Sequence, residues 1–255
     1  MFSKYLESSV LSIIQGISEF IPVSSSAHLL LTSELYEFSN SSLQLDICLH
    51  LGSLIAIIFY FRNDLKNILD NKNIFLLMLV GSIPLVTIGY FFYYTGLIDY
   101  FRNLKVIAWA TLIFGILLYF ADNNKKVKNF NNDLNFKNIL IIGFMQVLAI
   151  IPGVSRSGII ITASRFLNFD RIDSTKIAFY LSIPALTGAS VLSIKDILKS
   201  NIEFDLIYIF ATLLSFLASY FTIKFFLIYL KKYSLKFFVY YRIFLALILF
   251  LIIYY

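Results

Sequence analysis

The sequence predicts an all-α polytopic membrane protein with six transmembrane helices, two re-entrant helical hairpins and an inverted-topology repeat. Composition, the lengths of the apolar runs and a weak internal repeat lead to this prediction. Hydrophobic residues make up 59% of the 255-residue chain and charged residues 14%. A soluble domain usually carries about a quarter charged residues. The chain therefore lacks the polar residues that would cover a water-soluble fold, and we expect a single integral membrane domain over residues 1–255.

Six apolar runs are long enough to cross the bilayer core, which takes about 20 residues in a helix. They are residues 43–61, 74–95, 104–120, 174–194, 204–226 and 237–255. Four shorter runs, 8–21, 26–36, 139–151 and 158–167, form two pairs, and each pair is joined at a polar segment that contains a proline. Two short helices that meet at a break are typical of a re-entrant hairpin, which enters the membrane and returns.

The loop charges predict the orientation. With this topology fourteen Lys and Arg residues collect on one side and five on the other, so the first side is expected to be cytoplasmic and both termini outside. The net charge of +6 fits such topology signals and contacts with anionic lipid headgroups, and it requires no nucleic acid. Lys4 and the apolar run after it loosely imitate a cleaved signal peptide, but Glu19 interrupts that run and we expect no cleavage.

The chain also repeats itself. A shift of 131 residues aligns Gln15 with Gln146, Val23 with Val154, Ser24 with Ser155, Ser26 with Ser157, Ser33 with Ser164 and Phe38 with Phe169. The same order of elements recurs in 8–120 and 139–255, with 122–138 as the linker between the halves. Three crossings in each half would invert the second copy, and such repeats place their site near the bilayer midplane.

The first hairpin tip gathers chemistry that is rare in lipid. Glu19 shares a helical face with Gln15, and a carboxylate inside a membrane is costly enough to indicate a function. Pro22 ends the first short helix, and the serines Ser24, Ser25 and Ser26 begin the next one. His28 follows Ser25 by three residues, so hydroxyl and imidazole can lie on one face.

The second tip, residues 152–158, complements the first. Gly153 lets the backbone approach a ligand, and Ser155 and Ser157 flank Arg156 at the start of a helix. Helix N-termini attract anions, phosphate above all, and arginine binds phosphate through two parallel hydrogen bonds. At the positions of Glu19 and His28 the second copy has isoleucines, so neither tip alone would make the site.

Simpler interpretations stay open for several of these residues. The serines could serve only as helix caps, and Glu19 with Arg156 could form a structural ion pair. His28 could be a hydrogen-bonded core residue. His50 is expected to be a packing residue because it lacks neighbours like those of His28, and Cys48 because it is a lone thiol in an apolar run. Arg242, near a helix end, is expected to extend its side chain toward the membrane surface.

Two segments carry a family resemblance. Residues 15–28, Gln-Gly-Ile-Ser-Glu-Phe-Ile-Pro-Val-Ser-Ser-Ser-Ala-His, and residues 152–158, Pro-Gly-Val-Ser-Arg-Ser-Gly, resemble the paired signature of bacterial undecaprenyl-diphosphate phosphatases of the bacitracin-resistance type. Residues 49–53 and 184–189 are similar to further segments of that family. The resemblance implies an inner-membrane hydrolase that converts undecaprenyl diphosphate to undecaprenyl phosphate, recycling the lipid carrier of peptidoglycan synthesis with Mg²⁺ or Ca²⁺.

The resemblance also implies roles. Glu19, Ser25, His28 and Arg156 match the family's functional positions and would be catalytic, and Glu19 with Gln15 would hold the metal. From the helix N-termini at the two tips we expect a phosphate-binding set of Ser24, Ser26, Gly153, Ser155, Arg156 and Ser157. Gln15 stands where many members have Glu, which weakens the metal site, and Ala27 replaces a common Gly. The expected partners are a polyprenyl diphosphate, membrane lipid and a second copy in a homodimer. A polyprenyl-phosphate carrier or flippase without hydrolytic activity is the alternative, because inverted repeats are also transporter architecture.

Overall fold

The computed structural model describes residues 2–36, 43–124, 126–199 and 205–254, and within them it has helices and no strand. The all-helical class is thereby confirmed. The helices are α1 (Phe2–Ser18), α2 (Ser25–Leu35), α3 (Leu43–Tyr60), α4 (Arg62–Asp70), α5 (Lys72–Thr95), η1 (Leu97–Phe101), α6 (Leu104–Asp122), α7 (Phe130–Asp133), α8 (Phe136–Val147), η2 (Leu148–Ile150), α9 (Arg156–Phe166), α10 (Arg171–Lys199), α11 (Leu206–Lys232) and α12 (Lys236–Tyr254).

Five of the described helices are long and apolar enough to cross a membrane: α5, α6, α10, α11 and α12. A sixth span is possible if α3 counts together with α4, which follows it after a 70° bend. The outward faces of these helices expose large apolar side chains, among them Leu76, Ile83, Phe225, Phe244 and Leu251. Such a surface is not typical of a protein in water, since soluble monomers rarely expose apolar patches of this extent. The protein is a multi-pass membrane protein.

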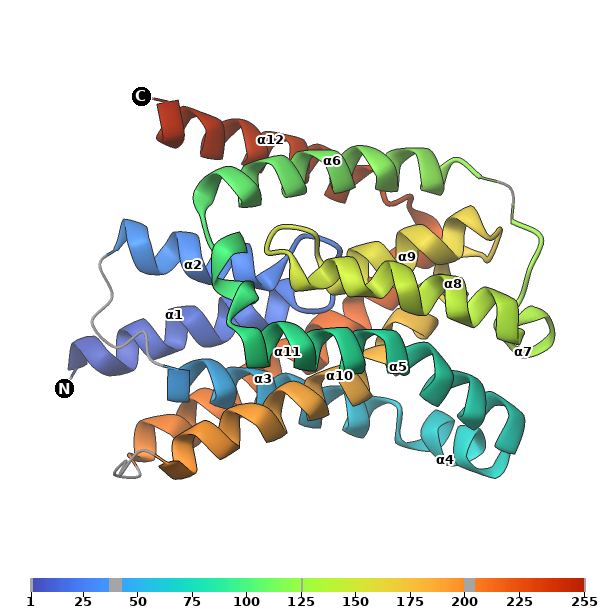
Figure 1. The fold of residues 1–255 in the computed structure, drawn as a ribbon, viewed down its shortest axis with the longest axis horizontal. Helices are drawn as coiled ribbons and strands as arrows, with labels where there is room; N and C mark the ends of the chain where they lie inside the picture. The colour runs from blue at the N-terminus through green and yellow to red at the C-terminus, as the bar shows by residue number, and fades with distance from the viewer. Residues whose placement is uncertain (1, 37–42, 125, 200–204, 255) are drawn as a thin grey trace.

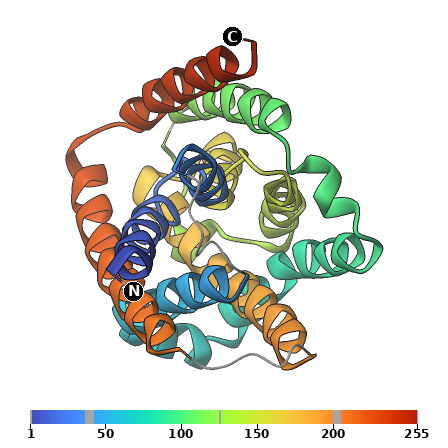
Figure 2. The same ribbon diagram turned by 90° about the vertical axis from the view of Figure 1, so that its left-hand side faces the viewer.

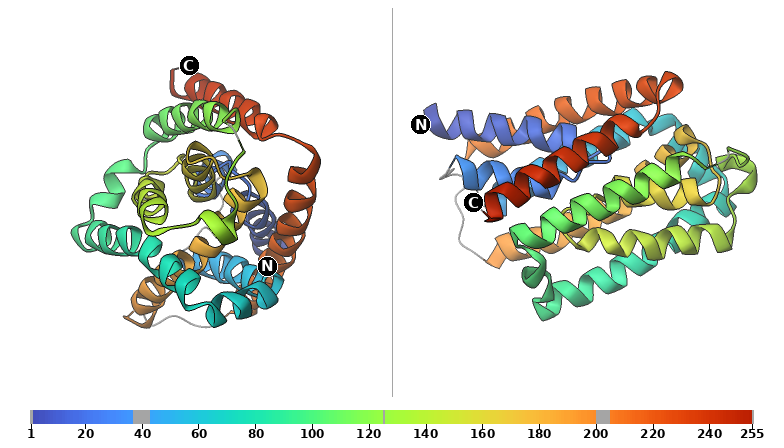
Figure 3. Two further views of the ribbon diagram at one scale, coloured as in Figure 1. Left: turned by 90° about the vertical axis from the view of Figure 1, so that its right-hand side faces the viewer. Right: turned by 90° about the horizontal axis from the view of Figure 1, so that it is seen from above.

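The two pairs of short helices enter the bundle from opposite ends, and their breaks meet near its middle (Figure 1). α2, α8 and α9 lie inside a ring formed by α5, α6, α10, α11 and α12, as both end-on views show (Figure 2 and Figure 3). With 11 residues, α2 is about 16 Å long, roughly half of the ~30 Å hydrocarbon core. Each pair therefore reaches the middle of the bundle and turns back. Both termini lie at the same end of the bundle (Figure 3).

Glycines let the short helices pack closely against long ones. A Cβ added at Gly16 of α1 would stand 2.5 Å from the Cβ of Ala218 on α11. A Cβ at Gly143 of α8 would meet the backbone of Gly81 on α5. α1 thus packs closely on α11 and α8 on α5, while α9 packs against α10 and α6, and these contacts fix how deep the tips lie.

Several elements differ from the prediction. α1 begins at Phe2 rather than at residue 8, and α4, which the hydropathy pattern did not indicate, follows the bend after α3. α4 has Ile68 as its buried residue, whereas most of its other side chains are at least partly exposed, so it lacks the apolar run that we used to find helices. Phe38 of the repeat and Lys125 of the loop charges lie outside the described residues.

The linker 122–138 is also more ordered than a polar connection requires. Asp122 is 2% exposed, and Arg171 donates hydrogen bonds of 2.6 and 2.9 Å to its two carboxylate oxygens. The fully buried Arg165 donates to the carbonyls of Asp122, Asn124 and Phe169. Arg165 and Arg171 are two of the fourteen loop charges on the side expected to be cytoplasmic. The structure gives them a second role, because they join the linker to α9 and α10.

Candidate active site

Both breaks use the same unusual backbone. Ser24 has φ 84° and Ser155 has φ 71°, a left-handed conformation that costs a non-glycine residue about 1–3 kcal/mol. The two serines are one of the pairs that the 131-residue shift aligns. Gly153, with φ 95°, completes the second turn without such a cost. Each half thus has a strained serine backbone at the same position of its tip. The strained residue turns the chain sharply, so that α2 and α9 begin in the interior.

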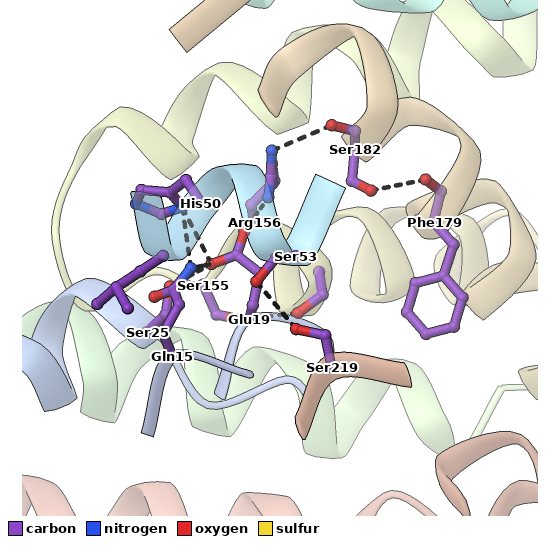
Figure 4. Close-up of polar contacts among 12 residues, drawn as sticks. Gln15, Glu19, Ser25, His50, Ser53, Ser155, Arg156, Phe179, Ser182 and Ser219 are labelled. Carbon is purple, nitrogen blue, oxygen red and sulfur yellow. Dashed lines mark hydrogen bonds and ion pairs between the residues drawn. The ribbon is translucent and has the colours of Figure 1, made fainter. Parts of the chain in front are cut away.

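Glu19 is the centre of the cluster that forms where the tips meet (Figure 4). It is 7% exposed, and its Oε1 forms an ion pair with Nη2 of Arg156 from the other tip. Its Oε2 accepts hydrogen bonds from Ser25 Oγ at 2.6 Å and from Gln15 Nε2 at 2.8 Å. The second guanidinium nitrogen of Arg156 donates to the carbonyl of Ser182 at 3.4 Å. The structure therefore joins carboxylate, hydroxyl and cation as the sequence predicted.

The other tip serines hold the two breaks together. Ser24 Oγ accepts a hydrogen bond from the Gly153 amide at 3.2 Å, and Ser157 Oγ donates to the Ile21 carbonyl at 3.0 Å. Ser155 caps α9, because its Oγ accepts from the Gly158 amide at 3.1 Å. Ser24, by contrast, makes no side-chain cap on α2. The first turn of α2 thus keeps more of its amide groups for an anion than the first turn of α9.

Ser26 and Arg156 are the members of the predicted phosphate-binding set that remain at least partly accessible. Ser26 is exposed, with its Oγ 3.3 Å from Ser24 Oγ, and the Arg156 side chain is 16% exposed. Ser24, Ser155 and Ser157 are buried. A phosphate would therefore meet Arg156 and the open end of α2, whereas the buried serines shape the tips.

His28 lies away from this cluster. Its Nδ1 is 2.6 Å from the Ser24 carbonyl and its Nε2 is 2.6 Å from the Tyr241 hydroxyl, against whose ring it stacks. The carbonyl can only accept, so Nδ1 carries the proton and Nε2 accepts from Tyr241. The i,i+3 spacing that suggested a Ser25–His28 pair is present in α2, but the imidazole hydrogen-bonds to α12 instead.

His50 was expected to be a packing residue, and that expectation is wrong. α3 places its Nδ1 2.9 Å from Gln15 Nε2 and 3.9 Å from Glu19 Oε2. The sequence did hold a signal, since residues 49–53 resemble a family segment. Asp46 and Ser53 are the polar residues at helical spacing from His50, but the hydrogen-bond partner in the structure is Gln15, 35 residues away, which helical spacing could not show.

Arg242 was expected to reach toward the membrane surface, and this is also wrong. Its side chain is fully buried, and it donates to the carbonyls of Pro22, Gly153 and Val154 at 3.3, 2.8 and 3.0 Å. A further bond of 3.2 Å goes to the Thr111 carbonyl on α6. Broken helices release carbonyls that lipid cannot satisfy, and the five donors of a guanidinium suit that need. Arg242 thus ties the backbones of the two tips together.

Arg242→Lys is expected to lower the free energy of unfolding by about 1–3 kcal/mol, because an ammonium has three donors for the four carbonyls and leaves at least one buried acceptor unpaired. Unfolding in mixed micelles measures the change. Arg62→Lys is the matched control, since Arg62 is exposed, and it should cost less than about 0.5 kcal/mol. Equal effects in the two variants would contradict a bracing role for Arg242.

The tip can also be tested for the divalent cation that the resemblance implies. Gln15 is fully buried, and its carbonyl Oε1 has no hydrogen-bond partner among the described residues. Glu19 adds two carboxylate oxygens. Mg²⁺ and Ca²⁺ bind oxygen, and Mg²⁺ is usually held by one or two carboxylates with the substrate's phosphates and water. Among the described residues no three His, Cys, Asp or Glu side chains are placed to hold a metal ion together. The oxygen donors of Glu19 and Gln15 are few, which fits a cation that is shared with a phosphate.

Comparison with known proteins decides the family. The family model described as "Bacitracin resistance protein BacA" matches residues 8–248. The chain belongs to this family. A protein named undecaprenyl-diphosphatase from Pelagibacter ubique (strain HTCC1062) is 53% identical over the full length of both chains. Relatives of the same name from Elusimicrobium minutum (strain Pei191) and Jannaschia sp. (strain CCS1) are 40% and 33% identical, covering 94% and 96% of this chain and 95% and 97% of their own.

Membership in the BacA family agrees with the resemblance that residues 15–28 and 152–158 indicated. The match covers both hairpin tips and at least part of every long helix that surrounds them. The cluster around Glu19 therefore lies inside the region that defines the family, and both tips contribute to it.

Proposed function

We propose that the protein is a hydrolase that removes the terminal phosphate of undecaprenyl diphosphate and leaves undecaprenyl phosphate. The observation that carries this proposal is the contact of Glu19 with both Ser25 and Arg156, which sets a hydroxyl, its acceptor and a phosphate-binding cation at one point. A lipid carrier would need the cation but neither an aligned hydroxyl nor a base. The curated relatives named undecaprenyl-diphosphatase support the hydrolase and not the carrier.

In the proposed reaction the diphosphate lies against Arg156 and the open N-terminus of α2. Ser25 Oγ attacks the terminal phosphorus while its proton passes to Glu19 Oε2, which is already 2.6 Å away. The bond from phosphorus to the bridging oxygen breaks, and the polyprenyl phosphate leaves with that oxygen. Water then attacks the phosphoserine, returning Ser25 and releasing inorganic phosphate. His28, which binds Ser24 and Tyr241, would support the turn from which Ser25 projects.

We propose Glu19 and Gln15 Oε1 as the protein's ligands for Mg²⁺ or Ca²⁺. When bound, the cation would neutralise charge on the phosphate oxygens. Removing divalent cations with a chelator should reduce phosphate release to the background of a Ser25→Ala variant, and adding Mg²⁺ or Ca²⁺ should restore it. Release that continues unchanged in excess chelator would contradict a cation in this reaction.

The deciding experiment is phosphate release by the purified protein from farnesyl or undecaprenyl diphosphate. Wild-type protein should release inorganic phosphate, whereas Ser25→Ala and Arg156→Ala should not. If wild-type protein with Mg²⁺ or Ca²⁺ releases none, the carrier is the better interpretation. If both variants release phosphate at the wild-type rate, the function stands and the site assignment fails.

The membrane arrangement is part of the proposal. We place the protein in the bacterial inner membrane with six spans, two re-entrant hairpins as an inverted repeat, and both termini outside. The opposed hairpins and the paired left-handed serines, Ser24 and Ser155, support the repeat. A tag at either terminus should then react with a membrane-impermeant reagent in spheroplasts, and reaction only after lysis would reverse the orientation. One chain supplies Glu19, Ser25 and Arg156, so a homodimer stays a separate prediction.

A further inference from the structure

We infer that His50 is a positioning residue of the site: its Nδ1 accepts one N–H of the Gln15 amide and thereby fixes that amide against Glu19. The inference rests on the proposed function, because its effect on the rate passes through Gln15 and Glu19 to Ser25. It assigns a role to the second of the two histidines in the chain, the one that was expected to be a packing residue.

The contacts form a short chain of hydrogen bonds. Gln15 Nε2 lies 2.8 Å from Glu19 Oε2 on the same hairpin and 2.9 Å from His50 Nδ1 on α3. An amide nitrogen carries two hydrogens, so it can donate to both at once. Gln15 is fully buried, and a buried N–H that loses its acceptor has no water to replace it.

The chemistry of the partners fixes the direction of each bond. If the Gln15 amide were turned over, its carbonyl oxygen would stand 2.8 Å from a carboxylate oxygen, and two acceptors would face each other. The nitrogen must therefore face Glu19. The same nitrogen then faces His50, so Nδ1 has to be the acceptor and the ring proton sits on Nε2.

Two consequences follow for the site. With both hydrogens of Gln15 Nε2 used, one on Glu19 and one on His50, the Gln15 carbonyl Oε1 keeps a fixed direction as a buried acceptor that has no partner among the described residues. Glu19 Oε2 keeps its position, and Ser25 Oγ donates to that same oxygen. Loss of the His50 acceptor would let the Gln15 amide rotate, which disturbs the carboxylate that Ser25 uses.

Three substitutions at residue 50 separate this role from packing. The side-chain oxygen of Asn can take the place of a histidine Nδ1, whereas the polar atoms of Gln reach the place of Nε2, and Leu has no acceptor. His50→Asn should keep kcat within about threefold of wild type. His50→Gln and His50→Leu should lower kcat roughly 10–100-fold, the usual loss when a residue that hydrogen-bonds to a metal-ligating side chain is replaced. KM should change little, because His50 does not touch the substrate.

Other patterns overturn the inference. If all three variants work as well as wild type, His50 is a packing residue. If all three fall equally, the acceptor at Nδ1 is not what matters. A double-mutant cycle guards against a folding defect: in a Gln15→Leu background, His50→Leu should change kcat by less than about twofold, because the residue through which His50 acts is gone. The same loss with and without Gln15 would contradict positioning.

A spectroscopic test is independent of hydrolysis. The chain has two histidines, so the ring-nitrogen signals in NMR spectra of ¹⁵N-histidine-labelled protein can be assigned with one His28 variant. At neutral pH His50 should show an unprotonated Nδ1 and a protonated Nε2, and Gln15→Leu should shift the Nδ1 signal. A protonated Nδ1, whether in the other tautomer or in an imidazolium paired with Glu19, would overturn the inference even in an active enzyme. If wild-type protein releases no phosphate, the proposed function fails instead, whatever the tautomer.

Discussion

Replacing Arg156 with glutamine is expected to lower phosphate release from a polyprenyl diphosphate by roughly 10²–10³-fold, the usual loss when one preorganised donor to a developing anion is removed. Arg156 is the cation that the second tip brings to Glu19, and it stands at the N-terminus of α9. Arg156→Lys keeps the positive charge but loses the planar guanidinium, so its rate should lie between those of wild type and Arg156→Gln. Single-turnover phosphate release at saturating substrate measures the effect on the chemical step.

The same substitution tests whether the ion pair is only structural. Arg156→Gln leaves the buried Glu19 carboxylate without its counter-ion, which should cost roughly 3–5 kcal/mol of stability. The double variant Glu19→Gln/Arg156→Gln removes both charges, so it should recover most of that stability while its activity stays lost. Wild-type activity in the double variant would show that the pair serves the fold alone.

The long apolar runs and the proline-containing breaks could be predicted because hydropathy and proline act locally. Pro22 and Pro152 interrupt their segments whatever surrounds them, and the structure has a break near each. The pairing of Glu19 with Arg156 could also be anticipated, since a carboxylate and a guanidinium inside a membrane each need a partner. Neither inference required knowledge of how the helices pack.

The role of Arg242 could not be predicted in this way. An arginine near a helix end is expected to extend its side chain to the membrane surface. In the structure Arg242 points inward, to the carbonyls of Pro22 and Val154, which lie 220 and 88 residues away in the sequence. The direction of the Arg242 side chain depends on the carbonyls that the two helix breaks leave without a partner in other segments. His28 shows the same limit. Helical spacing predicts the face of α2 on which His28 lies, but it cannot predict the hydrogen bond between His28 and Tyr241 of α12.

Ser25→Ala is expected to reduce the rate of phosphate release by more than about 10³-fold, as loss of an attacking hydroxyl does in enzymes that form a covalent intermediate. The reason is geometric: Ser25 Oγ stands at the start of α2 and already donates to Glu19 Oε2. Ser26→Ala is the matched control, since Ser26 is the exposed neighbouring hydroxyl and makes no contact with Glu19 among the described contacts. It should lower the rate by less than about tenfold, the loss of one hydrogen bond of roughly 1 kcal/mol.

Trapping decides whether Ser25 attacks or only binds. With substrate labelled in its terminal phosphate, rapid acid quench in a single turnover should leave label on the peptide that contains residue 25, and Ser25→Ala should leave none. Direct attack by water would give no labelled peptide, and Ser25→Ala would then cost only about tenfold, the value of a lost contact to phosphate. In that case Glu19 Oε2 would hold the water instead of the hydroxyl. The requirement for both tips would remain, because the acceptor and Arg156 still come from opposite hairpins.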